Sequence, residues 1–330
     1  MNTLAQSDAI TIESWLPESD ERLANDVLDG LTRPFKELPP KHLYDARGSE
    51  LFEQICDLPE YYPTRAETAI LSERATEVVA LTGAGELVEL GSGAADKARL
   101  LLDAMADAGT PRRYVPFDVS ESVVHATAEA LVSDYEGLCV HGVIGDFEHH
   151  LPCVPKRDGV PRLVALLGGT IGNLAPTPRR RLLRGIASLL GDGDHLLLGT
   201  DLVKDAAVIE AAYNDSLGVT AEFNRNVLHV INRELDGQFD VDAFEHVAFF
   251  DHDQEWIEMR LRARRAMTVR VDAIALEVAF AEGEELRTEI SAKFTIERVR
   301  ADLAAAGLIL NRWLSDEDGR FALSLASRAR

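Results

Sequence analysis

Cysteine is scarce in this chain, which has only three, Cys56, Cys139 and Cys153, among 330 residues. No two of them form a Cys-x-x-Cys pair, and an odd number does not suit a disulfide framework. Long apolar runs are also missing, since none approaches the ~20 residues that a membrane-spanning helix needs. Residues 1–18 are polar and acidic and lack the apolar core of a secretory signal. We therefore expect a cytoplasmic protein with reduced thiols and no membrane contact.

Positive charge is the other scarcity. The chain has 34 Lys and Arg residues against 56 Asp and Glu, a formal net charge of −22, and a short basic cluster at 179–181 does not extend into a stripe. Nucleic acid binding depends on Lys and Arg contacts with phosphates, so we expect no nucleic acid partner. Small zwitterionic or cationic substrates fit the charge better. The 46% hydrophobic fraction and the length indicate a globular protein of one large or two ordinary domains.

Patterns typical of metal ligands and nucleophiles are missing as well. His149-His150 and the Asp-His-Asp segment 251–253 hold potential ligands, but neither has helical i,i+4 spacing or Cys/His spacing. Cys153 lies beside a proline and has no base partner near it in the sequence. We interpret the histidines as exposed loop residues and predict no metal.

The most informative feature that is present is a set of strand ends. Three apolar runs each end at glycine or acidic residues: 87–90 at Gly91, 114–117 at Asp118 and 138–144 at Asp146. A helical pattern over 96–105 follows the first of these turns. The carboxyl ends of parallel strands share one edge of a sheet, and ligands bind in the crevice there. The sequence thus predicts a small-molecule site at that edge.

Each strand end suits one part of a nucleoside. Gly91 lets the backbone turn sharply and approach a ligand, and Asp118 is placed to accept both hydroxyls of a ribose. Asp146 can accept an N–H from an adenine edge, with Phe147 covering the ring. A dinucleotide fingerprint would have a third glycine where Asp96 stands, and a carboxylate there disfavours a pyrophosphate. The pattern therefore resembles the S-adenosylmethionine site of class I methyltransferases more than a nicotinamide site.

Strand and helix patterns alternate between residues 86 and 201, break at 204 and resume at 293. We expect an α/β protein: a doubly wound, Rossmann-like methyltransferase sheet with an antiparallel edge strand, plus a second α+β substrate-binding domain. Residues 66–203 and 293–330 would form the first domain, and residues 1–65 and 204–292 the second. Inside the second domain the patterns predict helices over 204–213 and 219–234 and strands over 256–271, 275–280 and 285–291.

Several motifs, spread over essentially the whole chain, resemble those of the histidine Nα-methyltransferases of ergothioneine biosynthesis. Two near the N-terminus are Tyr-Asp-x-x-Gly-Ser-x-Leu-Phe at 44–52 and Leu-Pro-Glu-Tyr-Tyr-Pro-Thr-Arg at 58–65. The others are Glu-Leu-Gly-Ser-Gly at 89–93, Gly-Gly-Thr-Ile-Gly-Asn at 168–173, Tyr-Asn-Asp at 213–215 and Phe-Asn-Arg-Asn at 223–226.

The resemblance implies a two-domain enzyme that uses S-adenosylmethionine to trimethylate the α-amine of L-histidine, giving hercynine by way of the mono- and dimethyl forms. The cofactor contacts that it implies are Gly91, Lys97, Asp118, Asp146 and Phe147, with Lys97 at the methionine carboxylate. The histidine contacts that it implies are Tyr61, Asn173, Tyr213, Glu289 and Ser291, with Met259 beside the imidazole. Tyr44, Tyr61 or water would take the protons that leave the amine. We expect the enzyme to be a monomer.

The implied histidine contacts suit that substrate chemically. Glu289 and Ser291 are two apart on an expected strand, so their side chains face the same way and match the two imidazole nitrogens. Asn173 and Tyr213 offer neutral hydrogen bonds to a carboxylate. A site that hydrogen-bonds its substrate can reject an analogue without that group by ~10⁴-fold.

Simpler interpretations remain for the same residues. Without the resemblance, Glu289 and Ser291 are typical of a solvated strand face, Tyr61 of a packed turn, and Lys97 of an exposed lysine in a first helical turn. Three rival functions stay open at this point: methylation of another aromatic amino acid, a non-catalytic S-adenosylmethionine-binding regulator, and a nicotinamide-dependent dehydrogenase.

Overall fold

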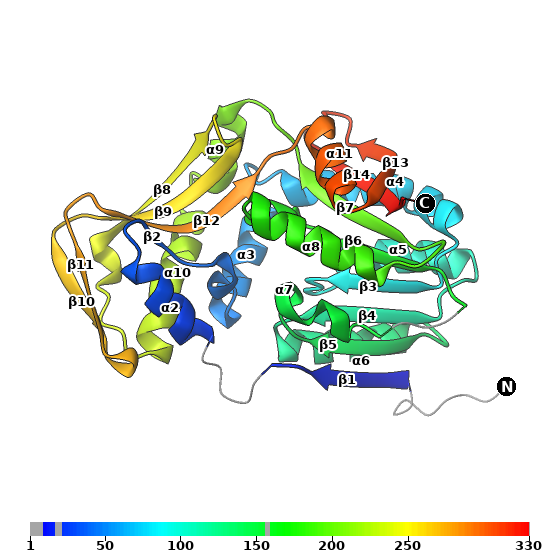
Figure 1. Cartoon of the computed structure of the whole chain (residues 1–330), viewed down its shortest axis with the longest axis horizontal. Coiled ribbons are helices and arrows are strands. Elements are labelled where there is room, and N and C mark those ends of the chain that lie inside the picture. Colours follow the sequence, from blue (N-terminus) through cyan, green and yellow to red (C-terminus); the bar gives the residue numbers. More distant parts are fainter. Residues whose placement is uncertain (1–8, 17–21, 156–158, 330) are drawn as a thin grey trace. The chain divides into compact units, whose positions relative to one another are not determined.

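The computed structural model describes residues 9–16, 22–155 and 159–329, which form two compact units (Figure 1). As far as the described residues reach, the first unit consists of Met1–Glu18, Ala66–Leu202 and Phe294–Arg330. The second consists of Ser19–Arg65 and Val203–Lys293. The second unit is thus made of two segments that are separated in the sequence by the sheet-forming part of the first.

An eight-stranded sheet with the order β1-β5-β4-β3-β6-β7-β14-β13 forms the first unit. Neighbouring strands are parallel from β1 to β7, whereas β14 is antiparallel to both β7 and β13. The expected doubly wound sheet with an antiparallel edge is therefore confirmed. The strands are β1 (Ile10–Ser14), β3 (Glu86–Leu90), β4 (Arg113–Asp118), β5 (Cys139–Ile144), β6 (Arg162–Leu166), β7 (His195–Asp201), β13 (Leu308–Ser315) and β14 (Phe321–Arg328).

The edge strand β1 differs from the sequence-based expectation, which assigned all of residues 1–65 to the second domain. Ile10 pairs with Val140 and Ser14 with Ile144, so this short segment extends the sheet of the first unit. Its signal in the sequence is weak, because only Ile10 and Ile12 are apolar and both are only partly buried. Residues 1–8 and 17–21 lie outside the described part of the chain.

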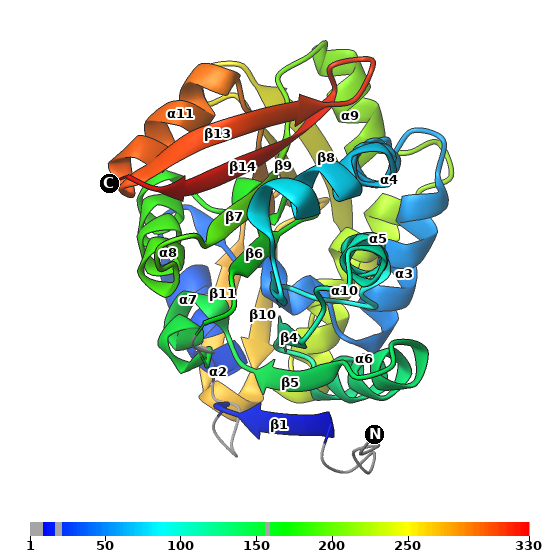
Figure 2. The same cartoon turned by 90° about the vertical axis from the view of Figure 1, so that its right-hand side faces the viewer.

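Helices cover both faces of this sheet (Figure 2). One face carries α4 (Pro63–Thr82), α5 (Asp96–Asp107) and α6 (Glu121–Asp134), and the other carries α8 (Pro176–Leu189) and α11 (Ile296–Ala305). All five residues of β3 are buried, as in a central parallel strand that is covered on both faces. No helix in the described ranges combines the length and apolar character that crossing a membrane requires.

The second unit packs helices against a mostly antiparallel sheet. Four strands have the order β2-β12-β9-β8, with only β2 parallel to its neighbour, and β10 and β11 form a separate hairpin. Alternate residues of β9, Ile257, Met259 and Leu261, are buried in a core shared with α10. The elements are α2 (Arg22–Thr32), β2 (Lys36–Glu37), α3 (Ala46–Asp57), α9 (Ala206–Tyr213), α10 (Val219–Glu234), β8 (Phe244–Asp251), β9 (Trp256–Ala263), β10 (Met267–Val271), β11 (Leu276–Phe280) and β12 (Glu285–Ala292).

Two expectations for the strands of this unit are wrong. Residues 256–271 form β9 and β10 with a break between them, where a single strand was expected, and β8 was missed. The pairing partner of β9 is β8, and a turn closed by Asp251 joins them, since Asp251 Oδ1 accepts the N–H groups of Asp253 and Gln254. Asp251 therefore closes a turn in a hairpin, a role that the sequence analysis did not give it.

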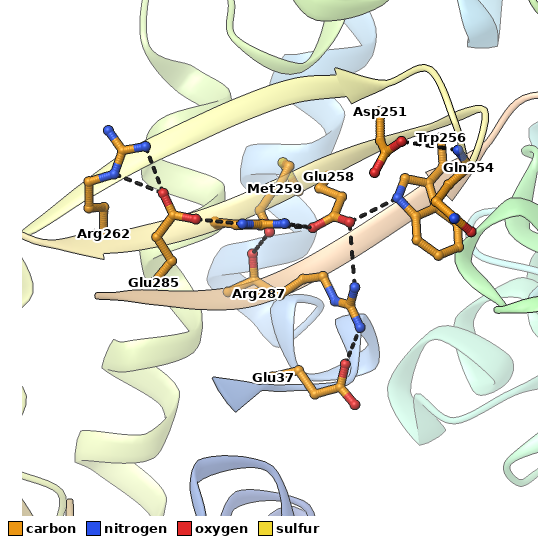
Figure 3. A network of polar contacts seen from close by, with 11 residues as sticks. Glu37, Asp251, Gln254, Trp256, Glu258, Met259, Arg262, Glu285 and Arg287 are labelled. Carbon is orange, nitrogen blue, oxygen red and sulfur yellow. Dashed lines mark hydrogen bonds and ion pairs between the residues drawn. The ribbon is translucent and has the colours of Figure 1, made fainter. Parts of the chain in front are cut away.

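The face of this sheet opposite the core carries an arginine–glutamate ladder (Figure 3). Glu258, which is 2% exposed, accepts hydrogen bonds from Trp256 Nε1 at 2.9 Å and from Arg260 at 2.6–2.8 Å. Glu285 bonds Arg260 and Arg262, each at 2.6 Å, and Arg287 pairs with Glu37. The ladder ties together β2, β9 and β12, so it supports the register of the sheet through side chains as well as the backbone.

Two of the sequence motifs meet at the start of α3. Asp45 is the N-cap of this helix and accepts the Gly48 N–H at 2.8 Å, while Asn226 of α10 donates to the same Asp45 oxygen at 2.6 Å. A Cβ on Gly48 would lie 1.7 Å from the carbonyl oxygen of Leu43, which explains the glycine. These residues of the 44–52 and 223–226 motifs therefore hold the fold of the second unit together.

Candidate functional site

The glycine turn after β3 is built as the sequence indicated. Gly91 and Gly93 have φ angles of +74° and +48°, which non-glycine residues seldom adopt. The Gly93 N–H donates to Asp118 Oδ2 at 3.1 Å, and Asp118 Oδ1 accepts from the backbone of Ser120 at 3.0 Å. The hydrogen bond from Gly93 thus connects the glycine turn to Asp118, which were predicted from separate strand ends, at the carboxyl edge of the sheet.

Asp146 lies at the end of the neighbouring strand. Asp118 pairs with Ile144 across β4 and β5, which brings the residues after both strands to the same edge. Asp146 is 6% exposed and caps the short helix α7 (Phe147–His150) by accepting the Glu148 N–H at 2.9 Å. Phe147 is partly buried. Two carboxylates and one aromatic ring, the groups expected for a nucleoside, therefore follow the ends of β4 and β5.

Lys97, on the first turn of α5, has a partner that the sequence did not reveal. Its ammonium lies 2.5 Å from Glu67 Oε2, and the Glu67 carboxylate also accepts the Gly168 N–H at 2.8 and 3.0 Å. Glu67 is fully buried, whereas 20% of the Lys97 side chain is exposed. The 58–65 motif ends two residues before Glu67, and this proximity was the only feature of the sequence that could have pointed to Glu67.

Glu89 lies buried in β3, just ahead of the glycine turn. It accepts a hydrogen bond from the Tyr114 hydroxyl at 2.5 Å. Burial raises the pKa of Glu89 to about 8, although the Tyr114 hydrogen bond and the charge of Lys97 act in the opposite direction. The acidic residue of this motif therefore favours its protonated form near neutral pH.

Asn173 follows β6 by way of an unusual turn. Gly168 and Gly169 both have positive φ angles, +75° and +66°, and the 3-10 helix Thr170–Asn173 comes next. Asn173 is partly buried, and within the described ranges its side-chain amide has no hydrogen-bond partner in the chain. Because the Gly168 N–H binds Glu67, this turn is linked to Lys97 through one buried carboxylate.

Three of the predicted histidine contacts lie on one face of the second unit's sheet. Glu289 of β12 pairs with Met259 of β9, and Ser291 pairs with Ile257, so all these side chains point to the core side. Glu289, Ser291 and Met259 are 7%, 4% and 2% exposed. Burial raises the pKa of Glu289 to about 7, and the charge of Lys293 limits that rise.

A bulge in β12 gives Glu289 this orientation. Thr288 is an extra residue, because Arg287 pairs with Arg260 and Glu289 with the adjacent Met259. The Thr288 hydroxyl donates to Asn224 Oδ1 at 2.5 Å, and Asn224 Nδ2 contacts Nδ1 of the buried His246 at 2.8 Å. Bulges commonly redirect side chains near functional sites. Asn224 of the 223–226 motif thus supports the strand that carries Glu289.

Aromatic rings gather around the predicted catalytic tyrosines. The rings of Tyr44, Phe52, Tyr61, Tyr213 and Phe223 form a cluster in which neighbouring centroids lie 5.2–6.3 Å apart. Burial of the phenols, reinforced by nearby groups such as Glu289, raises the pKa of Tyr44 and Tyr61 well above 10. Tyr44 shows this rise although 37% of its residue surface is exposed. Both tyrosines therefore stay neutral near pH 7.

Lys293, the residue after β12, is the second partner that the sequence analysis missed. It is fully buried, and its ammonium donates to Ser291 Oγ at 2.9 Å and to Tyr213 Oη at 3.1 Å. Continuing the alternation of Glu289 and Ser291 by two residues would have predicted its orientation. Lys293 thus connects two of the predicted substrate contacts.

The predicted site residues divide between the two units. The cofactor residues and Asn173 belong to the first, and Tyr44, Tyr61, Tyr213, Met259, Glu289 and Ser291 belong to the second. Across the described ranges, no group of three or more His, Cys, Asp or Glu side chains has an arrangement suited to a metal ion. His149 instead lies 3.3 Å from Asp146.

Comparison with known proteins removes one of the open alternatives. A sequence profile for histidine-specific, S-adenosylmethionine-dependent methyltransferases matches residues 23–328. The chain belongs to this family. Its cofactor is therefore S-adenosylmethionine, for which the glycine turn, Asp118 and Asp146 provide a fitting set of groups, and the nicotinamide alternative is excluded.

Individual relatives extend the match over nearly the full length. The chain is 55% identical over 308 residues to the histidine Nα-methyltransferase of Mycolicibacterium smegmatis, covering 93% of this chain and 95% of that protein. It is 54% identical over 321 residues to the histidine Nα-methyltransferase of Mycobacterium tuberculosis, covering 97% and 99%. Ergothioneine biosynthesis protein 1 of Neurospora crassa is 36% identical over 200 residues, which cover 60% of this chain and 23% of that protein.

The buried pair of Lys97 and Glu67 predicts an effect on stability that does not depend on the cofactor. Lys97→Met would leave the Glu67 carboxylate buried without its cation, at a cost of about 3 kcal/mol in the free energy of unfolding. Arg99→Met is the matched control on the same helix, since its pair with Asp134 is exposed and should contribute less than about 1 kcal/mol. Urea unfolding of both variants without ligand measures the difference. Equal losses would contradict the assignment.

The raised pKa of Glu289 predicts a pH-dependent gain for Glu289→Gln. The carboxyl has a pKa of about 7 in the folded chain against 4.5 as its ordinary value, so the folded state loses stability as pH rises between these values. Glutamine has no proton to lose. In thermal unfolding, the variant should gain, relative to the wild type, up to about 3 kcal/mol in the free energy of unfolding between pH 4.5 and pH 8, in addition to any pH-independent cost of leaving Lys293 without its carboxylate. A gain that is constant with pH would argue against this cause.

Proposed function

We propose that this enzyme trimethylates the α-amino group of L-histidine to hercynine, a step of ergothioneine biosynthesis, with the mono- and dimethyl forms as successive substrates. One observation carries the proposal: the chain is 54–55% identical to two histidine Nα-methyltransferases and has Glu289 and Ser291 buried on one strand face. An acceptor and a hydroxyl at that spacing complement the two nitrogens of an imidazole.

The first unit would bind the cofactor and the second the amino acid. When bound, S-adenosylmethionine supplies an electrophilic methyl group on its sulfonium. Asp118 would hold the ribose hydroxyls, and Asp146 with Phe147 the adenine, since a carboxylate has about four lone-pair sites and can accept further hydrogen bonds besides those from the backbone N–H groups. Lys97, whose side chain is 20% exposed, would meet the methionine carboxylate, with Glu67 fixing its position.

On the substrate side, ionised Glu289 would accept the imidazole N–H and Ser291 would donate to the other ring nitrogen, with Met259 packed beside the ring. Asn173 and Tyr213 would hold the carboxylate by neutral hydrogen bonds. Neutral groups suit this task because the amine becomes a fixed cation in the product. The aromatic cluster is also favourable for a quaternary ammonium, which ring faces attract.

Each methylation needs an unprotonated amine, so a proton must leave in every cycle. The high pKa values of Tyr44 and Tyr61 make them poor proton acceptors by themselves. We propose that they act as neutral phenols that orient the amine and pass its protons to water. The trimethylated nitrogen has neither a proton nor a lone pair, so the reaction would stop there.

The remaining expectations belong to the same proposal. We propose that the enzyme is cytoplasmic, acts as a monomer and has no nucleic acid partner. The net charge of −22 supports the last point. Size-exclusion chromatography with light scattering would test the oligomeric state.

Mass spectrometry tests the reaction directly. The protein is incubated with S-adenosylmethionine and each proteinogenic amino acid in turn. We expect histidine alone to gain three methyl groups and no fourth. Preferential methylation of tryptophan or tyrosine would establish another aromatic substrate, and cofactor binding without turnover would indicate a regulator.

Replacing Glu289 by alanine tests the imidazole contact. Glu289→Ala should lower kcat/KM for histidine by about 100-fold or more, because the ring N–H loses its acceptor. The matched control is Glu285→Ala on the same strand, whose side chain belongs to the arginine–glutamate ladder on the opposite face. Steady-state kinetics of both variants at pH 8 measure the contrast. Equal losses would reject the assigned role of Glu289.

A further inference from the structure

Lys293 has an environment that ordinary structural lysines lack. Its side chain is fully buried, and its ammonium contacts two hydroxyl groups, Ser291 Oγ at 2.9 Å and Tyr213 Oη at 3.1 Å. It also lies 4.7 Å from the centroid of the Tyr213 ring. Burying an ammonium is costly, so a residue held this way has a specific use for its charge or its donors.

The chemistry of an ammonium fixes the direction of the hydrogen bonds. It has three donors and no acceptor, so Ser291 Oγ must act as the acceptor toward Lys293. The hydroxyl proton of Ser291 is then directed away from Lys293, toward another acceptor. Ionised Glu289, two residues earlier on the same face, can only accept. The strand therefore presents one obligate acceptor and one donor side by side.

We propose that Lys293 is a positioning residue that sets this polarity, so that the site takes the neutral imidazole in a single tautomer. The N–H nitrogen of the ring faces Glu289, and the nitrogen with the lone pair faces the Ser291 hydroxyl. The inference rests on the proposed function, in which Glu289 and Ser291 bind the imidazole. It assigns a role to Lys293, which is not itself one of the proposed substrate contacts.

Charge supports the same role. The groups that interact with Glu289 are Lys293 from the end of its own strand, Tyr44 from the segment before α3 and Tyr61 from the segment before α4. Tyr213 of α9 contacts Lys293 and Tyr61. The phenols of Tyr44 and Tyr61 stay neutral near pH 7, and Lys293 lowers the pKa of Glu289. Lys293 thus favours the ionised form of Glu289 and offsets its charge, so that an uncharged imidazole fits better than an imidazolium.

The test compares Lys293→Met with wild-type enzyme over pH 6–9. We expect KM for histidine to rise about tenfold to a hundredfold with a much smaller change in kcat, because the ring is held less well. The acidic limb of the kcat/KM profile should also move to higher pH by about one unit, because Glu289 loses the cation that favours its ionised form. In Glu289→Gln the contribution of Glu289 to that limb should be absent with or without Lys293, which leaves only the ionisation of the substrate's own amine and imidazole.

Controls separate positioning from support of the fold. Lys204→Met is matched in geometry, since the Lys204 ammonium lies 2.7 Å from Tyr62 Oη and 4.5 Å from its ring centroid, and it should leave the pH profile unchanged. Lys293→Gln serves if the methionine variant does not fold. Ser291→Ala combined with Lys293→Met should cost little more than either change alone, since both act on one hydrogen bond.

An unmoved acidic limb with an unchanged KM, or a fall in kcat and thermal stability alone, would overturn the positioning role while leaving the histidine reaction in place. Absence of histidine methylation by the wild-type enzyme would overturn the proposed function and this inference with it.

Discussion

A carboxylate that is removed from water needs a cation or strong hydrogen bonds, and this constraint governs both units of the protein. In the first unit, Glu67 is fully buried and is compensated by Lys97 and the Gly168 N–H. In the second, Glu289 is almost fully buried, and Lys293 supplies the positive charge. The lysines are therefore part of the fold before any ligand arrives.

Carboxylates at the strand ends of the first unit are also held by hydrogen bonds before a ligand binds. Asp118 accepts the backbone N–H groups of Gly93 and Ser120, and Asp146 accepts that of Glu148, which fixes the carboxylates in place. A ligand that binds there does not have to order these side chains, so little conformational entropy is lost on binding. Side chains held by neighbouring hydrogen bonds are the usual basis of precise ligand geometry.

Much of this arrangement could be predicted from the sequence, for a clear physical reason. Strand–helix alternation, the glycine turn and the acidic residues at Asp118 and Asp146 are local patterns, and parallel strands bring their carboxyl ends together. The short edge strand β1 was missed because two isoleucines make a weak pattern, and β8 because its apolar residues do not alternate regularly with polar ones.

The buried partners of the charged residues could not be predicted in the same way. Lys97 and Glu67 are 30 residues apart, and Lys293 and Tyr213 are 80 apart. Nothing in the spacing of either pair marks it as a contact, because the contact depends on how whole elements pack. The family resemblance implied which residues would meet the ligands, but the groups that hold those residues emerged only from the three-dimensional arrangement.

The bulge at Thr288 has a consequence for how this strand can change. Glu285 and Glu289 are four residues apart, and in an uninterrupted strand they would share a face. The additional residue puts them on opposite sides. Glu285 belongs to the arginine–glutamate ladder, and Glu289 faces the aromatic cluster. The residues of this stretch can be substituted while one side of the sheet stays ionic and the other stays buried. Loss or gain of a single residue would put both glutamates on the same side, so the length of β12 between them is more tightly constrained than its composition.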